Sequence, residues 1–439
     1  MLNKFAYQSS RVGFTNTLAN RALIMNKDLP MRRLKLHEYQ AGKLLHKYRI
    51  PIPLGNVAFN GKEAYLVAKQ FGQQKKMEYV VKAQILGGGR GLGTFKENGY
   101  KGGVHIVKTP EEVQQVAEQM CGRHLVTKQS GEAGLPCNCV YIVEKLAIDK
   151  EFYLSITLDR KAGSPVFIYS KAGGMNIEDV AHNTPDQIFK YNIDVNKDLD
   201  IDELLKAAKN LDLEDYKSQV VFMFKHLYEC FMEKDCDLIE INPLALLHDG
   251  TLVAADSKVT IDDNAVFRQP DLKAEEDTSQ QNYKERIAKS FDLNYIYIGG
   301  NIGCLVNGAG LAMSTMDIIK LYGGNPANFL DVGGSAEGEQ MVEAIKLLNN
   351  DPEVDSIFIN IFGGILRCDN LAQSIITAAE QISLTKPIVL RLKGTNSAIA
   401  RDMIKPREKE LGIFFEDDFD SAARHVVDVA LKRSEAANK

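Results

Sequence analysis

The spacing of apolar residues changes near residue 290, and this change divides the chain into two parts with different expected folds. In the first part, segments with helical spacing alternate with segments in which apolar and polar residues follow one another. We expect helices at 34–50, 61–72, 109–122, 201–211 and 216–234, and strands at 56–60, 79–85, 102–107, 138–146, 151–159, 165–170, 236–247 and 252–261. Helices mixed with antiparallel strands indicate an α+β domain over residues 34–270.

The second part consists of five units in a row, each an apolar strand followed by a helical segment, and the first four strands end in a glycine turn. The strand-and-turn segments are 302–310, 327–334, 356–364, 387–394 and 413–417. Strands that are apolar throughout are expected when helices cover both faces of a parallel sheet. We therefore expect a doubly wound, flavodoxin-like α/β domain over residues 291–439. The stretch 271–290 is charged and poor in apolar residues, and we interpret it as a linker between the domains.

Residues 1–33 differ from the rest of the chain in composition. Lys4, Arg11, Arg21 and Lys27 are basic, no acidic residue occurs among the first 27 residues, and Ser, Thr and Asn are frequent. This composition is typical of a mitochondrial transit peptide. The alternative is a disordered N-terminal extension. We exclude these residues from the fold argument.

The overall composition is that of a globular protein and excludes some partners. The formal net charge of −5 gives no indication of nucleic-acid binding. No apolar run approaches the roughly 18 residues of a membrane-spanning helix. The 7 cysteines form no CxxC pair and no zinc-type spacing with histidine, which is consistent with reduced thiols.

A glycine-rich run, GGGRGLG at residues 87–93, follows the expected strand at 79–85. No Lys-Ser or Lys-Thr follows the glycines, so the run is not a Walker A motif. Glycines let a backbone approach a ligand closely, and Arg90 adds a fixed positive charge. Lys82, on the preceding strand, could reach a phosphate as a point charge. The run is therefore a candidate phosphate-binding loop, with a plain glycine loop as the alternative.

A second group of polar residues lies in LIEINP, residues 238–243, and on the strand expected to pair with it. Glu240 and Asn242 are two positions apart on a strand, so their side chains should share one side. Asp256, on the paired strand, could add a further oxygen. Mg²⁺ takes few protein ligands and completes its shell with phosphate and water. We expect a magnesium–nucleotide site, with a buried hydrogen-bonded polar pair as the alternative.

A third candidate site lies where the strands of the second domain end in glycines. Ligands in open α/β sheets bind at the carboxyl ends of strands, and helix N-termini attract anions. Gly363 and Gly364 are a candidate seat for a carboxylate or phosphate, and Asn307 could donate to the same anion. Tight turns that need glycine for geometry are the alternative. The chain shows no histidine in a glycine-rich turn, no GxSxG elbow and no evident thiol nucleophile, so it lacks an obvious covalent carrier.

The motifs KAQ…GGGRG, IEINPL, NAVFRQPDL, GNIGCLVNGAGLAM, PANFLDVGG and NIFGGILRCD resemble the β subunits of succinyl-CoA synthetase, also called succinate–CoA ligase. The resemblance covers nearly the whole chain after the N-terminal segment. It implies an N-terminal ATP-grasp domain and a C-terminal flavodoxin-like CoA-ligase domain. It also implies Mg²⁺ as the cofactor and an α subunit as the partner, which carries a phosphohistidine and most CoA contacts.

The resemblance implies roles for individual residues. The nucleotide would contact Lys82, Gly89, Arg90, Gly91, Glu144, Glu151 and Pro53, whereas Asn242 and Asp256 would bind the metal. Glu240 would orient the phosphohistidine and is the candidate catalytic residue. The succinate and phosphate side would be formed by Asn307, Gly364, Ile365 and Leu366.

The implied reaction converts succinyl-CoA, ADP and phosphate into succinate, CoA and ATP in the citric acid cycle, in the mitochondrial matrix or a related organelle. Guanine-specific relatives carry glutamine at the position of Pro53, and proline has no donor for the guanine oxygen, which favours ADP and ATP. A GTP-using form and a related β subunit, such as that of malate–CoA ligase, remain alternatives. A carboxylate–amine ligase with an ATP-grasp domain, or a scaffold without catalytic function, fits these motifs less well.

Overall fold

The computed structural model describes residues 34–74, 78–333, 338–364 and 367–437. The chain forms two compact units, which we call the N-terminal unit, ending at Gln280, and the C-terminal unit, starting at Gln281. The expected transit peptide lies outside the described residues. In the part of the chain that the structure describes, no helix is both long and apolar enough to cross a membrane.

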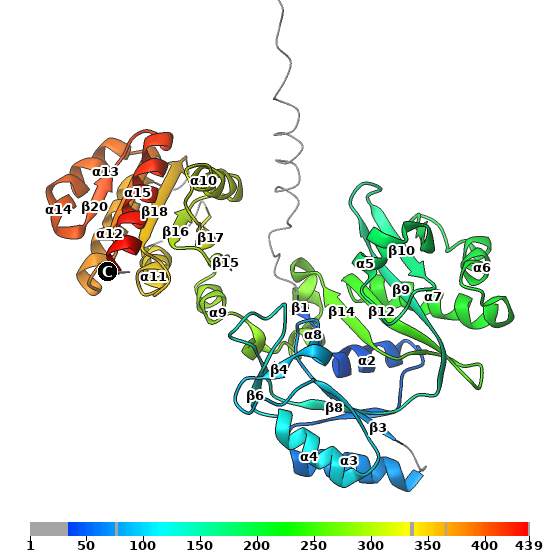
Figure 1. The fold of residues 1–439 in the computed structure, drawn as a ribbon. Coiled ribbons are helices and arrows are strands. Elements are labelled where there is room, and N and C mark those ends of the chain that lie inside the picture. The colour runs from blue at the N-terminus through cyan, green and yellow to red at the C-terminus, as the bar shows by residue number, and fades with distance from the viewer. Residues whose placement is uncertain (1–33, 75–77, 334–337, 365–366, 438–439) are drawn as a thin grey trace, which may run out of the picture. The chain divides into compact units, whose positions relative to one another are not determined.

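The largest sheet of the N-terminal unit has 7 strands and carries much of the unit's core (Figure 1). Its strands are β1 (Leu34–Lys35), β9 (Ile148–Asp159), β10 (Ser164–Ser170), β11 (Ile188–Asn192), β12 (Cys236–Leu247), β13 (Leu252–Ala254) and β14 (Ser257–Ile261). The order is β1–β14–β12–β9–β10–β11, and β13 also pairs with β12. The accompanying helices are α2 (Glu38–Lys47), α5 (Ile177–Asn183), η2 (Pro185–Gln187), α6 (Ile201–Asn210), η3 (Glu214–Tyr216), α7 (Lys217–Glu233), η4 (Asp263–Arg268) and α8 (Pro270–Lys273). Apolar side chains of α2, α6 and α7 pack against β9, β10 and β12 in one core.

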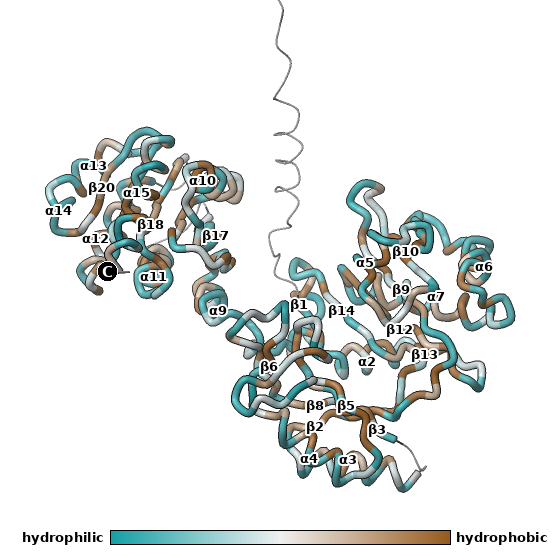
Figure 2. Tube along the Cα trace, viewed as in Figure 1, coloured by the Kyte–Doolittle hydropathy of each residue, from teal (hydrophilic) through white to brown (hydrophobic). Residues whose placement is uncertain are grey.

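Two smaller sheets complete the N-terminal unit. One contains β2 (Gly55–Ala58), β8 (Val140–Glu144), β3 (Tyr79–Ala83) and β5 (Val104–Val107), and the other contains β4 (Thr94–Phe95), β6 (Arg123–Val126) and β7 (Leu135–Cys137). Helices α3 (Gly61–Gln74) and α4 (Pro110–Met120) share a core with these strands, and η1 (Arg90–Leu92) lies in the glycine-rich run. Thr109 and Glu112 form a capping box that starts α4. Brown in Figure 2 marks the hydrophobic residues of β3, most of which are buried.

Two expectations for the N-terminal unit need correction. The expected helix at 34–50 begins at Glu38, because Leu34 and Lys35 pair with β14 instead. The expected strand at 252–261 is interrupted at Ala255 and Asp256, between β13 and β14. The segment 271–290 contains the end of α8, η5 (Thr278–Gln280) and α9 (Tyr283–Ser290), and the two units divide within it, so a linker there stays a prediction.

The C-terminal unit contains a sheet of 6 strands covered by helices on both faces. The strands are β15 (Asn294–Tyr297), β16 (Ile302–Val306), β17 (Asn328–Asp331), β18 (Ser356–Gly363), β19 (Ile388–Gly394) and β20 (Ile413–Phe415). The helices after α9 are α10 (Ala309–Leu321), α11 (Gly338–Asn349), α12 (Cys368–Gln381), α13 (Ser397–Ile404), η6 (Lys405–Arg407), α14 (Glu408–Leu411) and α15 (Phe419–Ala437). One core joins α11, α12 and α13 to the sheet, and a second core joins α10 and α15 to it.

The strand order of this sheet is β15–β17–β16–β18–β19–β20, with every pair parallel except β15–β17. The five parallel strands therefore have the flavodoxin-like order, with the antiparallel β15 added at one edge. The chain order reverses between β16 and β18, so the ligand crevice of such a sheet is expected where these two strands end.

Candidate functional site

Four charged side chains from separate elements of the N-terminal unit meet in one cluster. Lys82, on β3, places its Nζ 2.5 Å from Oε1 of Glu38, which lies in the first turn of α2. Arg90, in η1, places its Nη2 2.7 Å from Oε2 of Glu38 and 2.7 Å from Oδ2 of Asp256. Lys82 also donates to the carbonyl oxygen of Ala255 at 3.2 Å. The structure thus joins the predicted phosphate-binding cations to a predicted metal ligand, and we call these four residues the charge cluster.

The charges in this cluster depend on one another. Burial acts to raise the pKa of Glu38, but Arg90 and Lys82 outweigh it and hold that pKa below its ordinary value. Burial, and then the negative charge of Glu38, raise the pKa of Asp256, although Arg90 opposes them. The two carboxylates also raise the pKa of Arg90 against the effect of burial. Glu38 is therefore a buried counter-charge that forms ion pairs with both cations.

The glycine-rich run holds Arg90 at the edge of this cluster. Gly89 precedes η1 in the left-handed region, with φ of +76°, which glycine adopts without strain. The carbonyl oxygen of Arg90 accepts from the backbone N–H of Gly103 at 2.9 Å, which ties the run to the start of β5. A side chain at Gly91 would meet open space, so the fold itself does not require glycine there. The backbone at Gly91 is accordingly free to lie against a ligand.

Asn242 lies beside Asp256 where the strands of the large sheet are irregular. The pairing of β12 with β9 shifts register between Ile241 and Leu244, and the Asn242–Pro243 peptide bond is cis. The backbone N–H of Asn242 donates to the carbonyl oxygen of Asp256 at 3.1 Å. The Asn242 side chain also hydrogen-bonds that of Glu240, so the two share one side of β12, as the alternation predicts.

The loop after β10 reaches the side chain of Asn242. The Asn242 Oδ1 accepts from the backbone N–H of Gly174 at 2.8 Å, and its Nδ2 donates to the carbonyl oxygen of Met175 at 2.9 Å. Gly174 has a φ of +72°. A Cβ built at Gly174 would lie 2.3 Å from Oε2 of Glu151, so the Glu151 carboxylate occupies the space that a side chain would need. Glu151 thus lies against this loop.

Gly173→Ala is expected to lower turnover without unfolding the chain. A Cβ at Gly173 would lie 2.4 Å from the backbone nitrogen of Phe152, so the loop must move away from β9. That movement would break the two hydrogen bonds to Asn242. We expect a loss of about 1–3 kcal/mol in the free energy of unfolding and a clear fall in kcat, measured by chemical denaturation and steady-state kinetics. Gly163 has a φ of +65°, but a Cβ there would meet nothing within 4 Å, so Gly163→Ala is the control for backbone strain without a clash. Equal kinetic effects of both variants would contradict the role of this loop.

Glu240 is half-buried on β12, opposite Lys258 of β14. Burial raises the pKa of Glu240, while Lys258 acts in the other direction. The negative charges of Glu178 and Asp256 also raise this pKa. Glu240 therefore lies close enough to the charge cluster to interact with it.

Glu144 and the segment at Pro53 form one local structure. The backbone N–H of Leu54 donates to Oε1 of Glu144 at 3.0 Å, and the backbone N–H of Glu144 donates to the carbonyl oxygen of Leu54 at 2.9 Å. Pro53 is buried, whereas Leu54 is exposed. These contacts place the predicted base-selecting residue next to Glu144, which the resemblance also assigned to the nucleotide.

The oxygen ligands offered by this region suit a magnesium ion held mainly by phosphates. Within the described ranges, no group of three or more His, Cys, Asp or Glu side chains could hold a metal by itself. Asp256 and Asn242 supply a carboxylate and an amide oxygen at adjacent positions, and the Asp256 side chain is 37% exposed. Asn242 Oδ1 retains a second lone pair beyond its bond to Gly174. Two hard oxygens fit Mg²⁺ only if a bound nucleotide contributes further ligands.

In the C-terminal unit, the structure brings the predicted glycine turns to neighbouring strand ends. Asn307, directly after β16, accepts from the backbone N–H of Phe362 at 3.0 Å and donates to its carbonyl oxygen at 3.1 Å. Its amide therefore bridges β16 and β18 where the strand order reverses. Gly364 is exposed next to this bridge, and Ile365 and Leu366 lie outside the described residues. Asn307 can still offer a second N–H to a ligand.

The sequence did not single out two carboxylates that organise these sites. Asp331, at the end of β17, accepts through Oδ1 from the backbone N–H groups of Gly308 at 2.5 Å and Gly333 at 2.8 Å. Glu38 joins the two cations of the charge cluster. The only sequence signal for Glu38 is an acidic residue among the first, mostly buried positions of an amphipathic helix. That signal does not reveal a partner 44 residues away.

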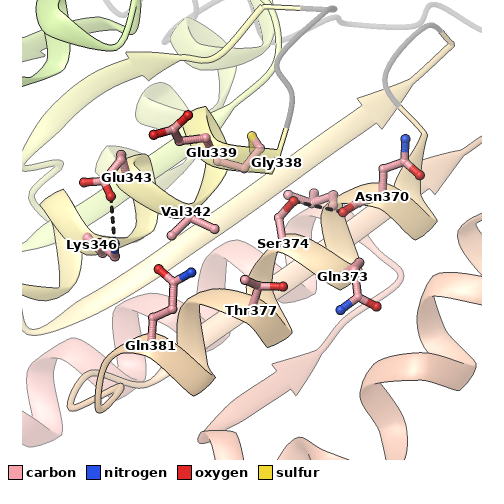
Figure 3. A pocket seen from close by; sticks show the side chains of 12 residues that line it. Gly338, Glu339, Val342, Glu343, Lys346, Asn370, Gln373, Ser374, Thr377 and Gln381 are labelled. Atoms are coloured by element: carbon pink, nitrogen blue, oxygen red, sulfur yellow. Dashed lines mark hydrogen bonds and ion pairs between the residues drawn. The ribbon is translucent and has the colours of Figure 1, made fainter.

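A cavity of about 750 Å³ in the C-terminal unit lies between α11 and α12 (Figure 3). Its charged lining residues are Glu339, Glu343 and Lys346, and Lys346 pairs with Glu343 at 2.7 Å. This lining carries a net negative charge, so it does not suit succinate or phosphate. Neither Asn307 nor Gly364 contributes to the cavity, which is therefore distinct from the predicted anion site.

Comparison with known proteins supports the two-domain interpretation. Residues 35–246 match the ATP-grasp domain family, and residues 305–426 match the CoA-ligase family. A solved structure, ATP citrate lyase from Methanothrix soehngenii in complex with citrate and coenzyme A, covers 91% of this chain and all of its own, with a TM-score of 0.68 at 17% identity. At that identity the likeness establishes the fold, namely an ATP-grasp domain followed by a flavodoxin-like CoA-ligase domain.

Two curated relatives are much more similar in sequence. The mitochondrial β subunit of ADP-forming succinate–CoA ligase from Oryza sativa is 47% identical over 96% of this chain and 99% of the relative. The subunit of the same name from Arabidopsis thaliana is 47% identical over 94% of this chain and 98% of the relative. The chain therefore belongs to the family of ADP-forming succinate–CoA ligase β subunits.

Proposed function

We propose that this chain, together with an α subunit, reversibly forms succinate, CoA and ATP from succinyl-CoA, ADP and phosphate. The observation that carries this proposal is the charge cluster, in which Lys82, Arg90 and Asp256 meet beside Asn242. Two cations and two metal-type oxygen ligands suit the phosphates of a magnesium nucleotide. The names of the two relatives supply the substrates, because the geometry alone does not identify an acyl group.

At the nucleotide end, we assign the phosphates to Lys82 and to the run Gly89–Gly91, which includes Arg90. Pro53, Glu144 and Glu151 would contact the base and ribose side. Asn242 and Asp256 would hold Mg²⁺, which, when bound, neutralises phosphate charge during in-line transfer. Glu240 would accept a hydrogen bond from the phosphohistidine ring and fix its orientation as it reaches the nucleotide.

In the C-terminal unit, Asn307 and residues 364–366 would contact succinate and phosphate at the switch point of the flavodoxin-like sheet. Phosphate attacks the thioester carbonyl, the carbon–sulfur bond breaks, and CoA leaves with succinyl phosphate formed. A histidine of the α subunit then takes the phosphoryl group and releases succinate. The mitochondrial relatives and the basic N-terminal segment support a location in the mitochondrial matrix or a related organelle.

The first experiment is to purify the tagged chain with its natural partner and to measure succinate- and CoA-dependent turnover with ATP and with GTP. We expect turnover with ATP well above that with GTP, together with phosphorylation of a histidine on the copurified chain. Strong GTP use would retain the ligase but contradict the base preference. Turnover with malate in place of succinate would contradict the assigned acyl substrate.

Pro53→Gln is expected to shift the preference of the complex towards GTP. Glutamine supplies an amide N–H for the guanine oxygen, and one such hydrogen bond contributes about 1 kcal/mol, which corresponds to about a fivefold change. The measurement is the ratio of kcat/KM for GTP to that for ATP. Pro51→Gln, two positions away and only half-buried, is the matched control. An unchanged ratio in Pro53→Gln would remove this position from nucleotide selection.

A further inference from the structure

Glu38 contacts both cations that we assign to the nucleotide phosphates, yet no step outlined above uses it. Its Oε1 lies 2.5 Å from Lys82 Nζ and its Oε2 lies 2.7 Å from Arg90 Nη2. We propose that Glu38 is a positioning residue that holds Lys82 and Arg90 together in the arrangement that receives the nucleotide phosphates. This inference rests on the proposed function of the N-terminal unit.

The two cations need such a counter-charge because they come from different elements and repel each other. Lys82 lies on a regular strand, whereas Arg90 lies in the glycine-rich run, whose backbone is adaptable. Asp256 forms an ion pair with Arg90, and the second hydrogen bond of Lys82 goes to a neutral carbonyl group. In the described part of the chain, Glu38 is the carboxylate that forms ion pairs with both cations. Without its charge, we expect Arg90 to move away from Lys82 with the loop.

Glu38 is itself held rigidly, as a positioning residue must be. Helix α2 contacts β14 of the large sheet and β2 of the four-stranded sheet. At its start, His37 donates its backbone N–H to Gln40 Oε1 at 2.8 Å, and its ring bonds to Asp277 at 2.8 Å. Gln40 in turn donates to the carbonyl oxygen of Glu275 at 2.8 Å. These bonds fix the first turn of α2, so the Glu38 carboxylate has one place to lie.

Burial distinguishes Glu38 from the other carboxylate of the charge cluster. The side chain of Glu38 is 6% exposed, whereas that of Asp256 is 37% exposed. Asp256 can therefore turn towards a metal when the nucleotide binds, but Glu38 has no route to solvent. The four charges of the cluster sum to zero before the nucleotide arrives, so the cations can remain in place between turnovers. Without the two paired cations, the buried Glu38 carboxylate would repel an incoming phosphate and would itself be costly to bury.

The test is Glu38→Gln in the complex with the α subunit. Glutamine keeps the size of the side chain and one acceptor but removes the charge. We expect the affinity for a fluorescent ADP analogue to fall about tenfold or more, with a raised KM for ADP and unchanged KM values for succinyl-CoA and phosphate. Glu38→Asp keeps the charge but is one methylene shorter, so it should bind the analogue better than Glu38→Gln. Tighter nucleotide binding in Glu38→Gln would overturn the proposal, because Glu38 would then be only a competitor of the phosphates.

Two comparisons separate positioning from general stability. Asp235 forms a two-point ion pair with Arg268 at the opposite end of the β12–β14 pairing. Asp235→Asn should leave nucleotide affinity unchanged, and an equal loss in both variants would overturn the proposal.

If Glu38 acts through the cations, Glu38→Gln should cost much less affinity in a Lys82→Met background, whereas additive losses would overturn the proposal. Absence of acyl-CoA turnover in the wild-type complex would instead reject the proposed function, and the affinity measurements would still test Glu38.

Discussion

Replacing Asp256 with alanine is expected to reduce nucleotide-dependent turnover by about 100-fold to 1000-fold, while the chain still assembles with its α subunit. The substitution removes one of two proposed metal oxygens and leaves Glu38 as the carboxylate paired with Arg90 among the described residues. Because the side chain of Asp256 is partly exposed, its truncation opens no cavity in the core. The measurement is turnover across a Mg²⁺ titration, with gel filtration of the complex as the assembly test.

Two further variants make this result specific to the metal. Asp256→Asn keeps the shape and one oxygen, so it should recover part of the activity at high Mg²⁺ concentration. Asp215→Ala removes an exposed carboxylate of the same unit in η3 and should behave as wild type. Unchanged turnover in Asp256→Ala would reject its assignment as a metal ligand. Loss of assembly would show instead that Asp256 is needed for the fold.

The sequence was most informative in the C-terminal unit. Fully apolar strands can only lie in a sheet that is covered on both faces, so their glycine turns had to converge at one edge. The structure places Asn307 and Gly364 at this edge, at the point where the order of strands reverses. The antiparallel β15 was not predicted, because a short edge strand carries little hydrophobic pattern.

The sequence was less informative where function depends on contacts between distant segments. The glycine run and Lys82 were recognisable, but Glu38 belongs to a helix that reads only as amphipathic. Its partnership with two cations follows from the packing of α2 between elements of two sheets, which no local pattern encodes. The segment 271–290 shows the same limit. Its charged residues do not reveal that Lys284 is buried and pairs with Asp351 at 2.7 Å.

The strand that carries Asp256 illustrates a third limit. Residues 252–261 alternate well enough to predict one strand, yet the strand is interrupted at Ala255 and Asp256. The interruption lies opposite the point where β12 shifts register against β9, although backbone bonds from Asn242 to Asp256 and from Ala255 to Pro243 still join the two segments. Periodicity detects regular strands and therefore misses the breaks at which functional side chains are often placed.

Glu240→Gln is expected to block phosphoryl transfer between the α subunit and the nucleotide while leaving the acyl half-reaction intact. Glutamine keeps the shape of Glu240 but cannot hold the imidazole N–H of a phosphohistidine as a carboxylate does. We expect phosphorylation of the α subunit by labelled ATP to slow by at least about 100-fold. Phosphorylation by succinyl-CoA and phosphate should continue at the wild-type rate, because Glu240 belongs to the N-terminal unit and we assign that step to the C-terminal unit.

The neighbouring carboxylate Glu178 provides the matched control. It lies on α5, is exposed, and contributes to the field that raises the pKa of Glu240. In the Glu178→Gln variant, the α subunit should be phosphorylated at wild-type rates both by labelled ATP and by succinyl-CoA with phosphate. If Glu240→Gln instead slowed both half-reactions equally, Glu240 would act on the enzyme as a whole and not on the visiting phosphohistidine. If it slowed neither, the carboxylate would serve only the packing of β12, and its position beside the charge cluster would have no catalytic meaning.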